Sequence, residues 1–157
     1  MFSALLLNLV NLKLFEETIV SVKIIVLFYM VGVLIFILFK SKLKEISPWN
    51  HINNFIFCLF VVGSYSTVLF LGSNYYFAEE ATENKTYQIM RKTEILGPKY
   101  NRGKKTPAVI IKTEKNNTKR IEFNRNMKAK IDKADFLELE LSNGLFNFDI
   151  IRRTKLK

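Results

Sequence analysis

The chain is dominated by two apolar runs, Ile24 to Phe39 (IIVLFYMVGVLIFILF) and Phe55 to Leu71 (FIFCLFVVGSYSTVLFL). Neither run contains a charged residue. With its flanking residues, each run reaches the roughly 20 residues that a helix needs to cross a hydrocarbon core about 30 Å thick. Pro48 lies between the runs and prevents one continuous helix. The sequence therefore predicts a membrane hairpin of two transmembrane helices in a lipid bilayer.

Small residues inside the runs predict how the two helices pack. Gly32 lies seven residues before Phe39, and Gly63 lies eight residues after Phe55, so both glycines fall at nearly the same depth in an antiparallel hairpin. Thr67 lies one turn beyond Gly63 on the same helix face. Small residues let helix backbones approach closely in lipid. We therefore expect Gly32 to pack against the stripe formed by Gly63 and Thr67.

Three single residues in or beside the runs have limited roles in this interpretation. Tyr65 points away from the expected glycine seam, and its hydroxyl needs a partner. That partner is either its own helix and neighbouring hydroxyls or a helix of another protein. Cys58 is the one cysteine, so it excludes an intramolecular disulfide and is interpreted as a small apolar filler. His51, the one histidine, is assigned a structural role at the membrane interface.

Residues 1–18 form an apolar segment that Asn8, Asn11 and Lys13 interrupt. The segment lacks the positively charged start and the small-residue cleavage site of a secretory signal, so we expect it to be retained. It has too few uninterrupted apolar residues to span a bilayer separately. Two interpretations stay open: an amphipathic helix in the membrane interface, or a helical extension of the first span.

The basic residues near the apolar runs predict an orientation. Lys40, Lys42 and Lys44 lie in the connection, whereas only Lys85 lies within about fifteen residues after Leu71. Because positive charge favours the cytoplasmic side, we expect a cytoplasmic connection and an exoplasmic C-terminal domain, in a bacterial cytoplasmic membrane.

The expected boundaries are residues 19–39 and 55–72 for the transmembrane helices, 40–54 for the basic connecting loop, 73–84 for a linker and 85–157 for the extramembrane domain.

From Lys85 onward, the continuous apolar runs give way to alternating apolar and polar residues. Such alternation is typical of half-buried strands. The pattern predicts strands at 86–96, 107–113, 119–124, 136–141 and 145–152, with 126–134 as either a short helix or an irregular crossing. About five antiparallel strands, mostly joined by tight turns, predict a small all-β domain of the SH3-like or OB-like kind. The expected core consists of Tyr87, Ile89, Val109, Ile111, Ile121, Phe123, Leu137, Leu139, Leu141, Phe148 and Ile150.

The C-terminal domain contains no pattern of a catalytic site. It has no histidine, no cysteine, no glycine-rich phosphate loop and no nucleophile elbow. Its carboxylates, such as Glu138 and Glu140, occupy solvent-facing strand positions in the predicted pattern. We therefore expect a non-enzymatic protein with no cofactor, no bound metal and no small-molecule substrate.

The charge of the C-terminal part is strongly positive. From Ser73 to Lys157 there are 19 Lys and Arg against 11 Asp and Glu, a balance of +8. The residues that we single out as candidate contacts to an anionic partner are Arg102, Lys104, Lys105, Lys119 and Arg120. Such a face can meet anionic headgroups or an acidic partner, although a merely solvated face is the simpler alternative. Aromatic residues are not interleaved with the basic ones, so we expect no nucleic-acid binding.

The closing segment, residues 143–151 (NGLFNFDII), resembles that of uncharacterised small bacterial two-pass membrane proteins with a C-terminal β-domain. These proteins have two spans, a basic link with Trp, and a final Gly-Leu-x-Gly-Phe-Asp-hydrophobic phrase. Here Asn147 stands where that phrase has its second glycine. Asparagine tolerates positive φ better than most residues, so we expect the turn to be kept. The resemblance implies an architecture and no activity.

The sequence as a whole predicts an integral membrane protein whose membrane-proximal β-domain is an interaction module, in the role of an accessory subunit of an envelope complex. The alternative is a free-standing module that binds anionic lipid headgroups or envelope polymer through its basic loops. The expected partners are the lipid bilayer and either another membrane protein or a second copy of the chain.

Overall fold

The computed structural model describes residues 2–96, 103–114 and 118–157. The chain divides into two compact units. The helical unit comprises Met1–Ala78 together with Gly144–Phe148, and the sheet unit comprises Glu79–Asn143 together with Asp149–Lys157.

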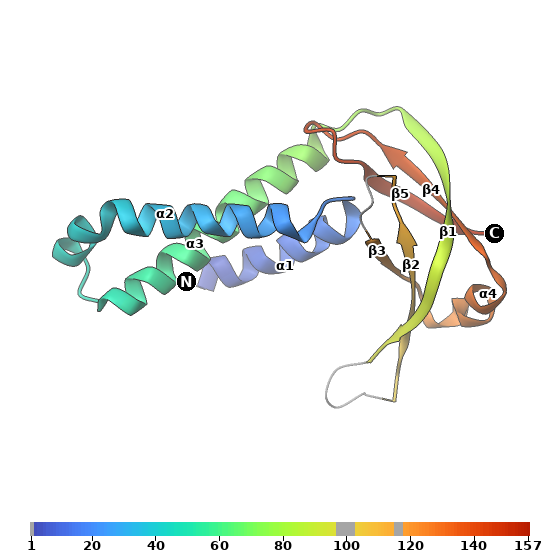
Figure 1. The fold of residues 1–157 in the computed structure, drawn as a ribbon, viewed down its shortest axis with the longest axis horizontal. Helices are drawn as coiled ribbons and strands as arrows, with labels where there is room; N and C mark the ends of the chain where they lie inside the picture. The colour runs from blue at the N-terminus through green and yellow to red at the C-terminus, as the bar shows by residue number, and fades with distance from the viewer. Residues whose placement is uncertain (1, 97–102, 115–117) are drawn as a thin grey trace. The chain divides into compact units, whose positions relative to one another are not determined.

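The helical unit contains three helices, α1 (Phe2–Glu17), α2 (Val22–Ile46) and α3 (His51–Tyr76), labelled in Figure 1. By length and composition, α2 and α3 could each cross a membrane. At 1.5 Å per residue, the 25 residues of α2 extend about 37 Å. Asn50 is the N-cap of α3, and its Oδ1 atom accepts a hydrogen bond of 2.9 Å from the backbone N–H of Asn53.

The connection between α2 and α3 is shorter than the expected loop over 40–54. Helix α2 continues through Lys40, Lys42 and Lys44 to Ile46, and α3 begins at His51. The segment KSKLKEI is rich in good helix formers and contains no breaker before Pro48. The lysines of the connection therefore lie on the last turns of α2.

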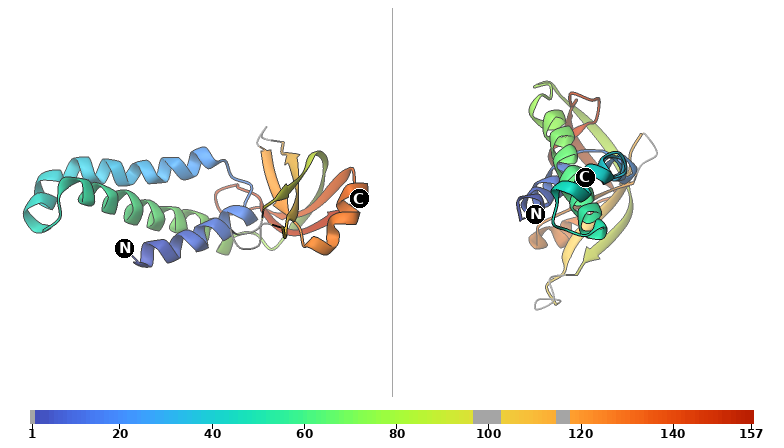
Figure 2. Two further views of the ribbon diagram at one scale, coloured as in Figure 1. Left: turned by 90° about the horizontal axis from the view of Figure 1, so that it is seen from below. Right: turned by 90° about the vertical axis from the view of Figure 1, so that its left-hand side faces the viewer.

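Helix α1 is a separate helix and not an extension of the first span. The chain leaves the helical conformation after Glu17 and returns to it at Val22. Thr18, Ile19 and Val20 form a β-branched run, which has low helix propensity, and all three are buried. Helix α3 packs against both α2 and α1, and Figure 2 shows the three helices running alongside one another. The predicted hairpin thus has a third helical partner.

The packed centre of the helical unit is small. Leu14, Val20 and Leu71 form its buried cluster. The apolar side chains that pack against this cluster are Phe15, Ile24, Ile25, Val68, Phe70, Tyr75 and Phe148. Many other large apolar side chains of these helices are exposed, among them Leu38 of α2, which is 76% exposed.

The sheet unit is built on five antiparallel strands, as the alternation predicted. They are β1 (Thr82–Ile95), β2 (Thr106–Lys112), β3 (Thr118–Glu122), β4 (Phe136–Ser142) and β5 (Ile150–Leu156), in the spatial order β3-β2-β1-β4-β5. The first half of β1 pairs with β4 and its second half pairs with β2. The register shifts between Ile89 and Arg91. Such an irregularity bends a strand, and the sheet is curled around β1 (Figure 1).

A 3-10 turn (Arg125–Met127) and the short helix α4 (Lys128–Lys133) connect β3 to β4. The helical alternative for residues 126–134 is therefore the better description. Ile131 is 2% exposed and Ala134 is 4% exposed, so this connection adds residues to the core that the strand pattern did not predict.

Most of the predicted sheet core is buried. The fully buried members include Val109, Ile111, Leu137 and Leu139, each 0% exposed. Ile89 and Phe148 are the exceptions, because both are only half-buried. Phe148 belongs to the helical unit and packs against the cluster there. The predicted strand over 145–152 was wrong in its first half: β5 begins only at Ile150, after a turn. The apparent alternation of Phe146 and Phe148 therefore does not reflect a strand.

Candidate functional site

The glycines of the predicted seam each make a close approach, but to different partners than expected. A Cβ atom added at Gly32 would lie 2.6 Å from the carbonyl oxygen of Cys58 and 3.0 Å from the Cα atom of Leu59. A Cβ atom added at Gly63 would lie 2.6 Å from the Cδ1 atom of Tyr29. The predicted pairing of Gly32 with Gly63 is therefore wrong by about one helical turn. The ring of Tyr29 fills the space in front of Gly63.

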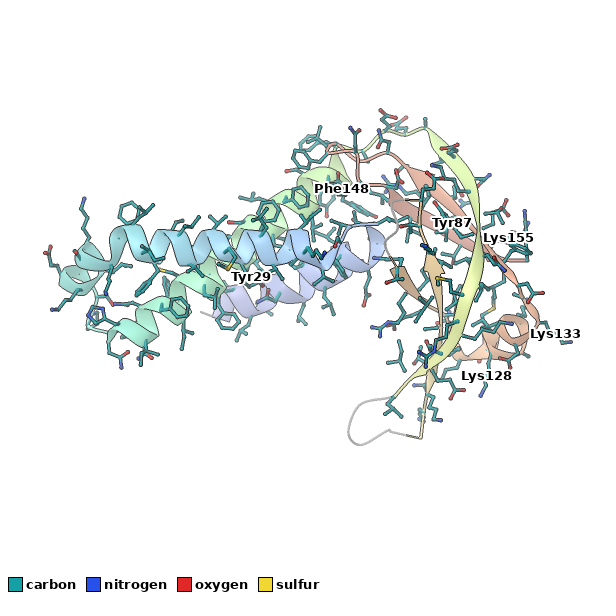
Figure 3. All side chains as sticks on the ribbon, in the orientation of Figure 1. Tyr29, Tyr87, Lys128, Lys133, Phe148 and Lys155 are labelled. Atoms are coloured by element: carbon teal, nitrogen blue, oxygen red, sulfur yellow. The ribbon has the colours of Figure 1, made fainter. Side chains whose placement is uncertain are left out.

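A polar cluster joins the three helices near Tyr29. The hydroxyl of Tyr29, which is labelled in Figure 3, donates a hydrogen bond of 2.5 Å to Asn8 Oδ1 of α1. The Oγ atom of Ser64 on α3 lies 3.1 Å from the same Asn8 oxygen and 2.5 Å from the carbonyl oxygen of Phe60. One amide oxygen of α1 is thus tied to side chains of both α2 and α3.

Asn11 and Thr67 complete this cluster on its inner side. The Nδ2 atom of Asn11 donates a hydrogen bond of 3.0 Å to the carbonyl oxygen of Ser64. Asn11 is 7% exposed and Thr67 is 0% exposed. Within the described part of the chain, Asn11 Oδ1 and Thr67 Oγ1 have no hydrogen-bond partner. The three atoms nearest to a Cβ at Gly32 belong to Cys58 and Leu59, so Thr67 is not the close partner of Gly32 that the sequence predicted.

The cluster borders a cleft of about 230 Å³. Residues from α1, α2 and α3 line it, namely Asn8, Asn11, Leu12, Phe15, Val22, Ile25, Tyr29, Thr67 and Leu71. All of these are uncharged. Since Leu12 and Val22 are 60% and 61% exposed, the cleft has an apolar rim on α1 and α2. Apolar walls with a few convergent polar groups are typical of small-molecule sites.

Asn74 makes a second set of polar contacts in the helical unit, with the segment Gly144–Phe148. Its Nδ2 atom donates to the carbonyl oxygen of Phe148 at 2.9 Å, and its Oδ1 atom accepts from the N–H of Phe146 at 3.0 Å. The ring of Phe70 stacks on Phe146 with centroids 5.1 Å apart and meets Phe148 edge-on at 5.6 Å. A side chain and a ring of α3 therefore hold this segment.

The conformation of this segment explains two of its residues. Asn147 has φ 59°, the only positive φ of a non-glycine residue in the described part of the chain. The expectation that asparagine would keep the turn is consistent with this geometry. At Gly144 a Cβ atom would collide with the side-chain amide of Asn74, so the close approach requires glycine.

Two other expectations concern single residues of α3. Tyr65 Oη lies 3.5 Å from the hydroxyl of Ser3 on α1, which is a neighbouring hydroxyl of the same chain. Cys58 is 4% exposed, and its carbonyl group lies at the close approach of Gly32.

The candidate anion contacts of the sheet unit are dispersed. Arg102 lies outside the described residues. Lys104 is exposed, and its carbonyl oxygen accepts a hydrogen bond of 3.2 Å from Arg125. Arg120 lies 3.7 Å from Glu122. Lys119 is 6% exposed, because strand alternation places it on the same buried face of β3 as Ile121. Its predicted role as a surface contact is therefore wrong.

Lys105 belongs to a surface ion-pair group around Glu94. The Nζ atoms of Lys105 and Lys128 lie 3.1 Å and 2.5 Å from the carboxylate of Glu94. Hydrogen bonds from Lys128 and Lys105 hold the pKa of Glu94 below its usual value, and the contact with Glu94 raises the pKa of Lys128. Lys128 and Lys133 are labelled on α4 in Figure 3. Part of the positive charge near this loop is thus already neutralised.

Sequence reasoning identified Gly32, Gly63 and Thr67 but missed Asn8, Asn11, Tyr29, Ser64 and Asn74 as contact-forming residues. The spacing of Asn8 and Asn11 was the available signal, since residues three apart share a helix face. Across residues 2–96, 103–114 and 118–157, no group of three or more His, Cys, Asp or Glu side chains could hold a metal ion.

Comparisons with protein-family models, with curated proteins and with solved structures gave no match. The fold itself defines the class: an α-helical unit with two helices long and apolar enough to cross a membrane, followed in the chain by a curled, five-stranded antiparallel sheet.

Proposed function

We propose that this chain is an integral membrane protein that α2 and α3 anchor in a bilayer, and that its sheet unit is a non-enzymatic interaction module. In this proposal the protein is an accessory subunit that binds another membrane protein of an envelope complex. The bend of β1 and the curl of the sheet support an SH3-like or OB-like architecture for the module.

The observation that carries the membrane anchor is the exposure of apolar side chains on the helices. The most apolar 18-residue window of α2 is 6% buried, and that of α3 is 28% buried. A core helix of a water-soluble protein has most of such a window buried. Leu27, Leu34 and Leu69 are each more than half exposed. Extended apolar surface of this kind is typical of membrane or protein contact.

The orientation remains the one that the lysines favour. Lys40, Lys42 and Lys44 lie on the last turns of α2, beside the short connection to α3. Basic residues at one end of a span favour the cytoplasmic side. We therefore propose a cytoplasmic connection and an exoplasmic sheet unit in a bacterial cytoplasmic membrane.

The alternative function is direct binding of anionic headgroups or envelope polymer through the basic loops. It has less support, because Glu94 pairs with Lys105, Glu122 pairs with Arg120, and Lys119 is buried. Lys104 keeps this alternative open, since its side chain is exposed.

Membrane anchoring is tested by washing membranes that contain the full chain with alkaline carbonate and floating them through a density gradient. The protein is expected to stay with the floating vesicles. A protein that is soluble and monodisperse without detergent would contradict the proposed anchor, its orientation and its role together.

The interaction role is tested by cross-linking in native membranes, purification in mild detergent and identification of co-purified chains. One membrane-protein partner at a fixed ratio is expected, or a second copy of this chain.

The alternative function, headgroup binding through the basic loops, is tested with the double variant Lys104→Ala and Lys105→Ala. The double variant Lys130→Ala and Lys133→Ala on α4 is the matched control. If the basic loops bind headgroups, the substitutions at Lys104 and Lys105 reduce sedimentation with anionic vesicles, and those at Lys130 and Lys133 do not. An equal result for both double variants would exclude this alternative.

A further inference from the structure

The outward face of α1 is apolar and its inward face is polar. Leu5, Leu9 and Leu12 recur at the spacing of one helix face and are 60%, 68% and 60% exposed. Asn11, by contrast, is 7% exposed, and both Asn8 and Asn11 form hydrogen bonds with the neighbouring helices. A helix on the surface of a water-soluble protein turns its apolar stripe inward and its polar residues toward water. The distribution on α1 is the reverse, as expected where the surrounding solvent is hydrocarbon.

Hydrogen bonds place the middle of α1 beside the middle of α3. The hydroxyl of Ser64 lies 3.1 Å from Asn8 Oδ1, and Asn11 Nδ2 donates to the carbonyl oxygen of Ser64 at 3.0 Å. Ser64 is one residue from the centre of the second apolar run. Tyr29, whose hydroxyl donates to Asn8 Oδ1, lies less than one turn from the centre of the first apolar run. Where the two runs cross a bilayer, Asn8 therefore lies near the bilayer's midplane.

A second contact fixes the direction of α1. Leu14 packs with Leu71 in the buried cluster, and Leu71 is the last residue of the second apolar run. At 1.5 Å per residue, α3 advances about 10.5 Å from Ser64 to Leu71, and α1 advances about 9 Å from Asn8 to Leu14. Helix α1 therefore runs parallel to α3, as Figure 2 also shows, and does not lie flat in the membrane interface. The charged residues of α1 all lie within one turn of Leu14, namely Lys13, Glu16 and Glu17.

The side chains on the outward face of α1 favour acyl chains over a partner helix. Contacts between helices in lipid are enriched in small residues, which let the backbones approach closely. The exposed apolar residues of α1 are instead all large, namely Leu5, Leu6, Leu9, Val10 and Leu12. Flexible acyl chains can fill the irregular surface of such side chains.

We propose that residues 3–12 of α1 lie in the hydrocarbon of the bilayer as a third membrane helix beside α2 and α3, and that the stripe of Leu5, Leu9 and Leu12 contacts the acyl chains. This inference rests on the proposed anchoring by α2 and α3. Asn8 and Asn11 can lie at this depth because they face the other two helices and each makes a hydrogen bond there.

The test measures the depth of single tryptophans in the full chain, reconstituted in phosphatidylcholine vesicles. Trp49, the one tryptophan, is first changed to phenylalanine, and Leu9→Trp then introduces a new ring at an exposed position. The vesicles contain phosphatidylcholine with bromine atoms either near the middle of the bilayer or near the headgroups, because bromine quenches tryptophan fluorescence on contact. We expect the deep bromines to quench Leu9→Trp more strongly than the shallow ones. Leu5→Trp, on the same stripe, should give the same result.

Two positions on α2 supply matched references. Leu34 is 57% exposed and lies less than one turn from the centre of the first apolar run, so Leu34→Trp is the deep reference. Ile46 is 81% exposed and ends α2 after its lysines, so Ile46→Trp is the shallow reference. The ratio of deep to shallow quenching should exceed one for Leu9→Trp and Leu34→Trp, and should fall below one for Ile46→Trp.

The references separate this inference from the proposed anchor. If Leu34→Trp is deep and Leu9→Trp matches Ile46→Trp, α1 lies at the interface, so the inference is refuted and the anchor is kept. If neither lipid quenches Leu9→Trp while Leu34→Trp is quenched, protein covers the stripe, and the inference is again refuted. If Leu34→Trp itself is not quenched by the deep bromines, the anchor is refuted, and the membrane position of α1 with it.

Discussion

The helical unit and the sheet unit distribute their side chains in opposite ways. In the sheet unit, Val109 and Leu139 are fully buried and the charges of Lys128 and Arg153 are exposed. In the helical unit, Asn74 and Thr67 are fully buried, while leucines such as Leu38 are exposed. A sheet that buries its apolar residues is adapted to water. The opposite distribution in the helical unit is the one expected if, as proposed, its helices lie in lipid, which cannot form hydrogen bonds. The two units of this chain therefore bury opposite kinds of side chain.

The largest expected effect comes from exchanging leucine for alanine in each unit. Leu139→Ala should destabilise the sheet unit by about 2–5 kcal/mol, because it leaves a cavity in a fully buried site. Leu34→Ala, at a position that is 57% exposed, should change stability little. Hydrogen exchange of the full chain in detergent micelles measures both. An equal loss of stability in the two variants would contradict the difference in leucine burial between the two units.

The next effect concerns the close crossing of α2 and α3. Gly32→Ala should cost about 2–3 kcal/mol, because the added methyl group meets the backbone of Cys58 and neither helix can move aside cheaply. Gly72→Ala is the matched control, since a Cβ atom there has no atom within 4 Å and alanine favours a helix. Thermal unfolding monitored by circular dichroism in detergent would show the difference. A neutral Gly32→Ala would mean that the helices are not held at this distance.

Asn74→Ala should have a smaller effect of about 1–2 kcal/mol. It removes the acceptor of the Phe146 N–H and the donor to the Phe148 carbonyl oxygen. Faster hydrogen exchange at Phe146 is the expected sign. The variant Asn147→Gly should leave exchange unchanged, because glycine also adopts a φ of 59°. Protection of Phe146 that survives in Asn74→Ala would refute the role of Asn74.

The smallest effect is the pH dependence of the surface ion pairs in the sheet unit. The pKa of Glu94 in the folded state lies below its ordinary value. Its stabilising contribution is therefore present above that ordinary value and is lost as the pH falls through the lower folded-state value. The melting temperatures of wild type and Glu94→Gln, measured from pH 7 to pH 3, should converge at the acid end. A constant difference would show that Glu94 acts through something other than its charge.

Much of the fold could be predicted because the signals are local. The two apolar runs and the alternation in FLELEL appear in consecutive residues, and they correspond to α2, α3 and β4. The local pattern gave a wrong prediction for Phe146 and Phe148, which alternate as strand residues do but lie before β5 begins. They also misled at Lys119, because one register position decides whether a strand residue is buried or exposed.

The candidate site was less predictable, because its members come from different helices. The cluster of Asn8, Tyr29 and Ser64 depends on the packing of α1 against α3, and on a crossing of α2 and α3 that differs from the expected one by about a turn. The sequence showed two asparagines in an apolar segment, but not which groups they would meet.

The order of residues was enough to predict two long apolar helices with uncharged central runs and a sheet of about five antiparallel strands. Periodicity and composition belong to consecutive residues, so no distant contact is needed to recognise them. Tertiary packing alone decided that Gly32 meets Cys58, that Asn74 holds the segment Gly144–Phe148, and that Asn11 and Thr67 share one cleft. Those outcomes depend on how whole helix surfaces interlock, which is the sum of many weak contacts between residues far apart in the chain.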